Sequence, residues 1–160
     1  MIFRKATSED KTEILALYRS LIGTPYCAWG NGYPGEQEFD YDLGRDSLFC
    51  MENGKGEIIG TITVDEDAQV EALSCWSKNL QPSAELSRLG ERTDMQNQGI
   101  ARLLLQHGME ELKKQGKKSV QFLVCKTNRK ALRSYNKLNF DVVGESDLFG
   151  EDWWCYEKAL

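Results

Sequence analysis

Gln96-Asn97-Gln98-Gly99-Ile100-Ala101 is the most informative segment of the sequence. It joins a predicted strand at residues 85–91 to a long predicted helix at 99–115. The first N–H groups of a helix have no intrahelical partner, and the helix dipole favours anions there. A glycine at such a turn lets a phosphate approach the backbone, which a bulky side chain would block. The segment therefore predicts an anion-binding turn, and a second element is needed to say which anion it binds.

A second informative pair, Asn128 and Tyr135, lies on a predicted helix that follows the next strand, residues 119–125. Positions 128 and 135 are two helical turns apart, so an amide and a phenol share a face and can line one ligand. The alternative is structural. In that case Asn128 only caps the helix and Tyr135 is an aromatic residue of the core.

Together these segments resemble the GNAT superfamily of N-acetyltransferases over residues 84–144. Gln96-x-x-Gly99-x-Ala101 matches the acyl-CoA signature of that family. Asn128-x-x-Ala131-x-x-x-Tyr135, followed by Leu138-Asn139-Phe140, matches its second block. The order and spacing of the two blocks agree with the family, and before residue 84 the resemblance rests on the order of elements.

This resemblance implies an enzyme that uses acetyl-CoA and no metal, and it assigns roles to residues. The amides of the turn hold the CoA pyrophosphate, the preceding strand pairs with the pantetheine arm, Asn128 contacts that arm, and Tyr135 lies by the sulfur. The implied cofactor-binding residues are Leu89, Gly90, Glu91, Gln96, Asn97, Gln98, Gly99, Ile100, Ala101, Asn128 and Tyr135.

The resemblance also implies a general base, because the family's frequent strand glutamate falls at Glu85. The other interpretation of Glu85 is a cross-strand ion-pair partner. A regular strand would put Glu85 and Glu91 on one face, and a β-bulge would separate them. Three positions depart from the family. Glu91 replaces a usually apolar residue, and Asn97 and Asn139 stand where glycine is common, although asparagine tolerates left-handed backbone.

Acetyl transfer to an amine fits these residue types. An amine with a pKa of ~10.4 is almost entirely protonated at pH 7, so a carboxylate such as Glu85 has a proton to remove. A backbone amide of residues 89–91 can stabilise the oxyanion, and the Tyr135 phenol can donate to the leaving thiolate. Attack is then direct, and Cys125 is expected to be a structural cysteine rather than a nucleophile.

The remaining pattern predicts an α/β fold. We predict strands at residues 2–6, 47–52, 57–65, 85–91, 119–125, 140–143 and 153–158, and helices at 14–22, 99–115 and from a cap at Thr127 or Asn128 to a stop at Asn139. A capping box at residues 7–10 precedes the first helix, and Asn53-Gly54 marks a hairpin. Residues 23–46 are predicted to be loop-rich, and a helix near 70–76 is one interpretation of an ambiguous stretch. The fold class is thus a GNAT-like single domain, residues 1–160, with a central mixed, mostly antiparallel sheet flanked by helices.

Composition bounds the function classes. The 160 residues are 41% hydrophobic and 28% charged, which is typical of a globular domain. The sequence contains no apolar run of the ~20 residues that a membrane helix needs, and its start lacks a signal-peptide pattern, so we expect a cytoplasmic protein without a membrane partner. Five cysteines without a Cys-x-x-Cys pair, and the single histidine His107, argue against a disulfide framework, a zinc site or a Ser/His/Asp triad.

Charge is unevenly distributed along the chain. Residues 112–140 contain nine Lys or Arg and no Asp or Glu, although the net charge of the chain is -5. This basic block suits a locally bound anion, and the plainer interpretation is a solvated lysine face. A nucleic-acid site is a further alternative, which the acidic overall balance disfavours.

Two acidic segments bear on the acceptor. Residues 23–46 hold the aromatic residues Tyr26, Trp29, Tyr33, Phe39 and Tyr41 together with Glu36, Glu38, Asp40, Asp42 and Asp46, and residues 141–157 hold six further acids and no Lys or Arg. In the fold that this sequence resembles, these connections flank the acceptor. We therefore expect a small-molecule or peptide amine, with a cationic one favoured by aromatic faces and carboxylates.

The acidic segments and the function each have an alternative interpretation. The acidic segments can also be a solvated surface with aromatic core residues. The rival function is a non-catalytic acyl-CoA sensor or interaction module on the same fold. The sequence leaves the acceptor and a homodimeric state undetermined.

Overall fold

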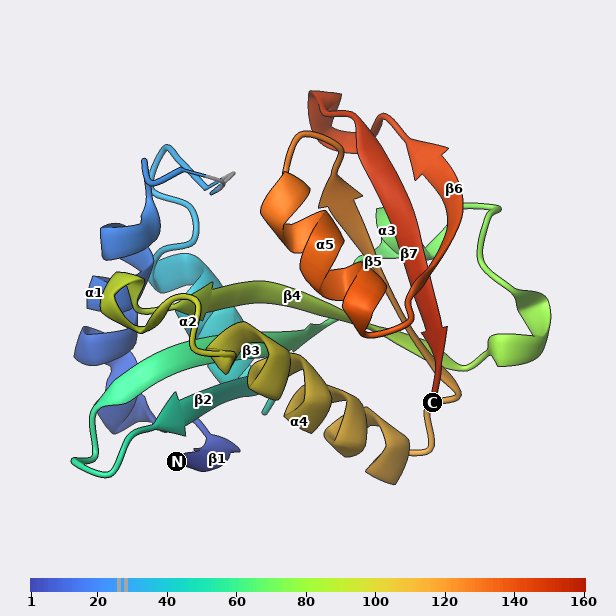
Figure 1. The fold of residues 1–160 in the computed structure, drawn as a ribbon. Helices are drawn as coiled ribbons and strands as arrows, with labels where there is room; N and C mark the ends of the chain where they lie inside the picture. The colour runs from blue at the N-terminus through green and yellow to red at the C-terminus, as the bar shows by residue number, and fades with distance from the viewer. Residues whose placement is uncertain (26, 28) are drawn as a thin grey trace. The chain divides into compact units, whose positions relative to one another are not determined.

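The computed structural model describes residues 1–25, 27 and 29–160. Its strands form a seven-stranded mixed sheet in the order β1-β2-β3-β4-β5-β7-β6 (Figure 1). The strands are β1 (Ile2–Lys5), β2 (Leu48–Glu52), β3 (Ile58–Asp65), β4 (Ser83–Glu91), β5 (Ser119–Cys125), β6 (Asp141–Ser146) and β7 (Trp153–Ala159). The helices are α1 (Lys11–Leu21), α2 (Glu36–Gly44), α3 (Ala68–Glu71), α4 (Ile100–Lys114) and α5 (Arg129–Lys137). The predicted fold class is confirmed.

The chain divides into two compact units. The first comprises Met1–Val64 and Ser87–Gly108, and the second comprises Asp65–Leu86 and Met109–Leu160.

In the first unit, helices cover both faces of the antiparallel strands β1, β2 and β3. Successive residues of a strand point to opposite faces, so Leu48 and Cys50 lie on one face and Phe49 on the other. Leu48 and Cys50 belong to a buried cluster with residues of α1 and α2. On the opposite face Phe3 stacks on Phe49 and on His107 of α4, with centroid distances of 5.3 and 4.8 Å.

In the second unit, β7 pairs antiparallel with both β5 and β6, and the start of β4 pairs with β5 in parallel. One face of these strands carries an aromatic cluster built with α5. The other face packs against Val70 and Trp76, which form a buried cluster with Cys155. The parallel pair is the only exception to antiparallel pairing among the strand pairs described above, as the sequence predicts.

The loop-rich stretch 23–46 contains a helix that the sequence analysis missed, because α2 occupies Glu36–Gly44. Its buried positions are Phe39 and Asp42, both without exposed surface. Since one of the two inward positions holds an aspartate, apolar residues do not recur at helical spacing there. The N–H of Gly35 donates to the Glu38 carboxylate at 2.8 Å and so satisfies a backbone group at the helix start.

The structure confirms the predicted capping box, hairpin turn and helix stop. Thr7 and Asp10 form the predicted capping box, in which the Thr7 N–H donates to the Asp10 carboxylate at 2.7 Å. Asn53 shapes the predicted hairpin turn by accepting from the N–H of Lys55 at 2.9 Å. Asn139 has a left-handed φ of 62° just after α5, which confirms that it ends this helix.

The helix considered near residues 70–76 is present, but it is shorter and begins earlier in the sequence. α3 spans Ala68–Glu71 because Asp67 caps it, accepting from the N–H groups of Gln69 and Val70 at 2.9 and 3.3 Å. An aspartate cap fixes where a helix begins, and this one places the start before the apolar residues of the stretch.

Candidate functional site

The predicted site residues fall into two groups, one in each compact unit. The first unit holds the end of β4, with Leu89, Gly90 and Glu91, and the turn at residues 96–101. The second unit holds Glu85, Asn128 and Tyr135.

The turn before α4 has a backbone that suits an anion. Asn97 and Gly99 are both left-handed, with φ of 65° and 81°. This confirms that asparagine can take a place where glycine is common. A hydrogen bond of 3.0 Å runs from the Leu103 N–H to the Gly99 carbonyl. The N–H groups of Ile100 and Ala101 lie before this bond, where a helix has unsatisfied donors and a positive dipole end.

The surroundings of the turn leave room for a ligand. A Cβ built on Gly99 meets no heavy atom within 4 Å, and the residues from Asn97 to Gly99 are exposed. Ile100 is fully buried and anchors the start of the helix behind them. The N–H of Gln96 is used within the chain, because it donates to the Thr93 carbonyl at 3.4 Å. The exposed part of the predicted anion site is therefore residues 97–99.

β4 is interrupted just before the residues predicted to meet the pantetheine arm. Arg88 has a φ of 44° inside this strand. A left-handed residue in a strand is characteristic of β-bulges, which disturb the alternation of side chains. Glu85 precedes this break and Glu91 follows it, so the two carboxylates need not share a face as they would on a regular strand.

Gly90 lies close to the helical layer. A Cβ at this position would lie 2.9 Å from the Leu21 side chain and 3.2 Å from the Trp29 ring. A larger residue at position 90 would therefore force the Leu21 and Trp29 side chains to shift.

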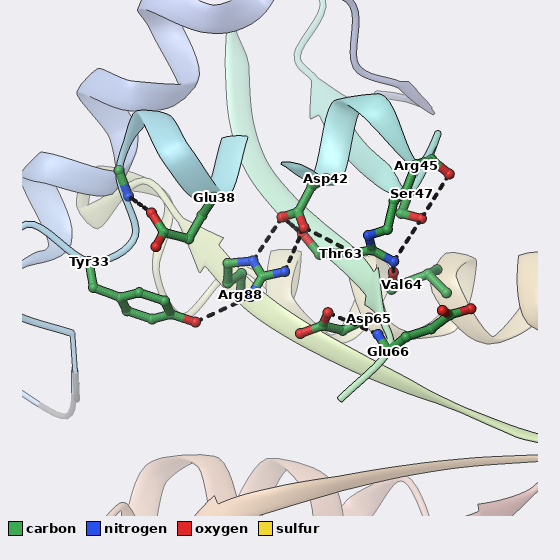
Figure 2. A network of polar contacts seen from close by, with 11 residues as sticks. Tyr33, Glu38, Asp42, Arg45, Ser47, Thr63, Val64, Asp65, Glu66 and Arg88 are labelled. Carbon is green, nitrogen blue, oxygen red and sulfur yellow. Dashed lines mark hydrogen bonds and ion pairs between the residues drawn. The ribbon is translucent and has the colours of Figure 1, made fainter. Parts of the chain in front are cut away.

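The Arg88 side chain is held by a buried carboxylate of α2, as Figure 2 shows. Its Nε donates to Asp42 Oδ2 at 2.8 Å and its Nη2 to Asp42 Oδ1 at 2.6 Å. Arg45 Nη2 donates to the same Oδ1 at 3.0 Å, and Thr63 Oγ1 to Oδ2 at 3.0 Å. Asp42 is fully buried and the Arg88 side chain is 8% exposed. Arg88 Nη1 also donates to the Tyr33 hydroxyl at 3.2 Å.

This network lies beside the irregular backbone and fixes the Arg88 side chain. A left-handed conformation costs a residue with a Cβ about 1–2 kcal/mol. Arg88 makes two charge-assisted hydrogen bonds to Asp42, which define the position and orientation of its guanidinium. Because both groups are buried, desolvation offsets much of the energy gained by the pair, so its main effect is on the geometry of Arg88. Neither Arg88 nor Asp42 is predicted from the sequence as a residue of the site. The local pattern that points to α2 is Asp42 three residues after Phe39, in a stretch with a glycine before Glu36.

In the second unit, Asn128 begins α5 by accepting from the Ala131 N–H through its Oδ1 at 3.1 Å. The structural role considered for Asn128 is therefore present. The cap places Asn128 in the short connection between β5 and α5, two helical turns from Tyr135, as the sequence predicts.

Tyr135 packs in an aromatic cluster. Its ring centroid lies 5.0 Å from Phe122, 5.9 Å from Phe140 and 5.9 Å from Tyr156, all at steep interplanar angles. Burial raises the pKa of Tyr135 to about 12. The phenol therefore stays protonated across the physiological range and can act as a hydrogen-bond donor.

Glu85 lies in a polar row across the sheet of the second unit. It is in register with Gln121 of β5, which in turn is in register with Glu157 of β7. Glu157 is buried and accepts from the N–H and the hydroxyl of Ser77 at 2.8 and 2.6 Å. The cross-strand neighbour of Glu85 on β5 is thus the amide side chain of Gln121 and not a cationic side chain.

Glu85 and Tyr135 belong to opposite faces of these strands. Residues in register share a face, so Glu85 lies on the face of Gln121. Tyr135 packs against Phe122, which follows Gln121 and therefore points to the other face. A base at Glu85 and a donor at Tyr135 would approach from different sides of the sheet.

Many acids of the two acidic segments are engaged by cations of their own unit. These ion pairs are Lys11 with Glu36 and Asp40, Lys5 with Asp46, Arg45 and Arg88 with Asp42, and Lys126 with Glu145 and Asp152. Their charge is compensated within the protein, which weakens the electrostatic argument for a strongly cationic acceptor. Tyr33 and Tyr41 are exposed to 42% and 55%, and Tyr26 lies outside the described residues.

No three or more His, Cys, Asp or Glu side chains of the described residues are arranged to hold a metal ion. The described helices include none with the length and apolar character required to span a bilayer. All five cysteines are free thiols.

Comparison with a family model matches the acetyltransferase (GNAT) family to residues 14–140. This range includes both blocks quoted from the sequence. No curated protein sequence matches the chain significantly.

Solved structures of low sequence identity share the fold. An N-acetyltransferase from Staphylococcus aureus Mu50 is 22% identical, with a TM-score of 0.74 over 99% of this chain and 97% of that one. A ribosomal-protein-alanine N-acetyltransferase from Brucella melitensis is 18% identical, with a TM-score of 0.75 over 100% of both chains. The PaiA N-acetyltransferase from Thermoplasma acidophilum, solved with coenzyme A, is 20% identical, with a TM-score of 0.72 over 99% and 98%.

Proposed function

Since this chain belongs to the acetyltransferase (GNAT) family, we propose that it transfers the acetyl group of acetyl-CoA to a primary amine by direct attack. The observation that carries the proposal is the turn at residues 97–99, where left-handed backbone, exposed residues and the start of α4 coincide. Backbone donors at a helix start suit a pyrophosphate. The CoA complex of the Thermoplasma relative supports the same cofactor class.

The reaction proposed here needs one proton acceptor and one hydrogen-bond donor. Glu85 takes one proton from the ammonium group, directly or through water, and the free amine nitrogen attacks the thioester carbonyl carbon. The C–S bond then breaks, and the second N–H proton passes through solvent to the departing thiolate. One backbone N–H of residues 89–91 stabilises the oxyanion.

Tyr135 is proposed to donate a hydrogen bond to the leaving sulfur. Its pKa of about 12 lies well above the ~8.5 of an ordinary thiol, so the phenol keeps its proton while it stabilises the thiolate. Asn128 is proposed to contact the pantetheine arm from the start of α5. No covalent acetyl-enzyme is required.

The acceptor is proposed to be a small-molecule or peptide amine. The exposed ring of Tyr33 can pack against an ammonium group, whereas the Tyr41 ring already has the Arg45 guanidinium 4.4 Å from its centroid and much of the nearby acidity is paired. Aromatic contact therefore supports this proposal better than net charge does. Nucleic acid and membrane are not proposed as partners, and the cytoplasmic location and a homodimer stay predictions.

A Glu85→Gln variant tests the base. We expect turnover to fall by about a hundredfold or more at neutral pH, because the protonated amine then lacks a proton acceptor. The deficit should shrink as the pH rises toward the amine pKa of ~10.4, where free amine no longer needs the base. The measurement is a pH-rate profile of the wild type and the variant.

Glu91→Gln is the matched control, since it removes the same charge from the same strand beyond the break at Arg88. It should change CoA binding and leave the shape of the pH profile unchanged. Equal losses in both variants, independent of pH, would exclude Glu85 as the base.

A further inference from the structure

Arg88 joins three parts of the first unit, as Figure 2 shows. Its backbone forms the left-handed break in β4. Its guanidinium donates two hydrogen bonds to Asp42 of α2, and its Nη1 donates to the Tyr33 hydroxyl in the loop before α2. We propose that Arg88 is a positioning residue of the acyl-CoA site, because its ion pair with the buried Asp42 fixes the backbone from which residues 89–91 continue. This inference rests on the proposed function, in which the N–H groups of these residues receive the thioester.

The conformation of Arg88 requires an external restraint. Glycine, asparagine or aspartate are the residues that adopt a positive φ readily, and arginine is not among them. The N–H directions of the following residues depend on this single torsion, so a relaxed backbone at position 88 would redirect them. A restraint on the side chain of Arg88 is therefore a restraint on the predicted oxyanion and pantetheine donors.

The contact to Asp42 has the geometry of such a restraint. Two donors of one planar guanidinium meet the two oxygens of one carboxylate at 2.8 and 2.6 Å, which fixes both position and orientation. Asp42 is itself immobilised by Thr63 and Arg45 and has no exposed surface. The restraint thus runs from α2 through one buried ion pair to β4.

Arg45 provides a matched comparison. It contacts the same Asp42 oxygen as Arg88 does, at 3.0 Å, but it belongs to the end of α2 and has no part in β4. Replacing either arginine by lysine keeps a positive charge beside the buried carboxylate, so both variants retain the charge balance that folding needs. Only Arg88→Lys removes the bidentate contact between a residue of β4 and the Asp42 carboxylate.

The experiment measures amide hydrogen exchange of residues 89–91 by NMR, together with CoA affinity by calorimetry, in the wild type and both variants. We expect Arg88→Lys to speed the exchange and to weaken CoA binding, each by about tenfold, as loss of one strong hydrogen bond would. Arg45→Lys should have a clearly smaller effect on both quantities, because Asp42 keeps its contacts with Arg88 and Thr63.

Three results would overturn the inference. Unchanged exchange in Arg88→Lys would mean that the ion pair does not hold β4. Faster exchange with wild-type CoA affinity would mean that it holds the strand without serving the site. Equal effects in Arg45→Lys would assign them to the charge balance of Asp42. If the wild type itself does not bind CoA, the proposed function fails, and the exchange rates still show separately whether Arg88 fixes the strand.

Discussion

A Gly99→Trp variant should lose CoA binding, with an affinity at least about a hundredfold below that of the wild type, or ~2.7 kcal/mol. The indole would occupy the space above the exposed turn where a phosphate must approach the backbone. The protein should still fold, because a Cβ at Gly99 meets nothing within 4 Å and the positive φ costs only about 1–2 kcal/mol. Calorimetric titration with CoA measures the loss.

Gly99→Asn is the control for this experiment. Asparagine accepts left-handed backbone, as Asn97 does two residues earlier, and it is far smaller than tryptophan. We expect this variant to bind CoA within about tenfold of the wild type. Wild-type affinity in Gly99→Trp would mean that the turn does not bind the cofactor.

Replacing Tyr135 by phenylalanine should lower turnover by about a hundredfold while CoA affinity stays near normal. The ring stays in its cluster with Phe122 and Phe140, so packing is preserved and only the hydroxyl is lost. Because burial raises the pKa of Tyr135 to about 12, the wild type should show no loss of activity from ionisation of this phenol below about pH 11. Steady-state kinetics with acetyl-CoA and an accepted amine test both statements.

Tyr156→Phe is the matched control, because Tyr156 lies in the same cluster and its hydroxyl contacts Asn136 at 3.4 Å. Its loss should leave turnover within about threefold. A Tyr135→Phe variant as active as Tyr156→Phe would reduce Tyr135 to a packing residue.

Much of the fold was predictable because its signals are local. The capping box at Thr7, the hairpin at Asn53 and the amphipathic face of α4 each lie within a few residues, and each specifies one element. α2 was not predictable in this way. One of its two buried positions is Asp42, and an aspartate facing inward removes the apolar repeat on which helix assignment depends.

The same distinction applies to the site. The turn at residues 96–101 can be read from the sequence because its glycine, its asparagine and its helix are contiguous. The ion pair of Asp42 with Arg88 joins residues 46 positions apart, and neither has a local motif. Sequence alone raised the possibility of a bulge in β4, but it could not place one at Arg88, since the restraint that stabilises it comes from α2.

Acetyl transfer by this protein should be measurable as thiol release from acetyl-CoA. The wild-type protein would be assayed against a panel of primary amines, polyamines, aminoglycosides and peptides, with the product identified by mass spectrometry. The proposed function predicts amine-dependent release of CoA with at least one acceptor and an acetylated product. CoA binding in calorimetry without release in the presence of any of these amines would contradict it and would favour a non-catalytic acyl-CoA sensor on the same fold.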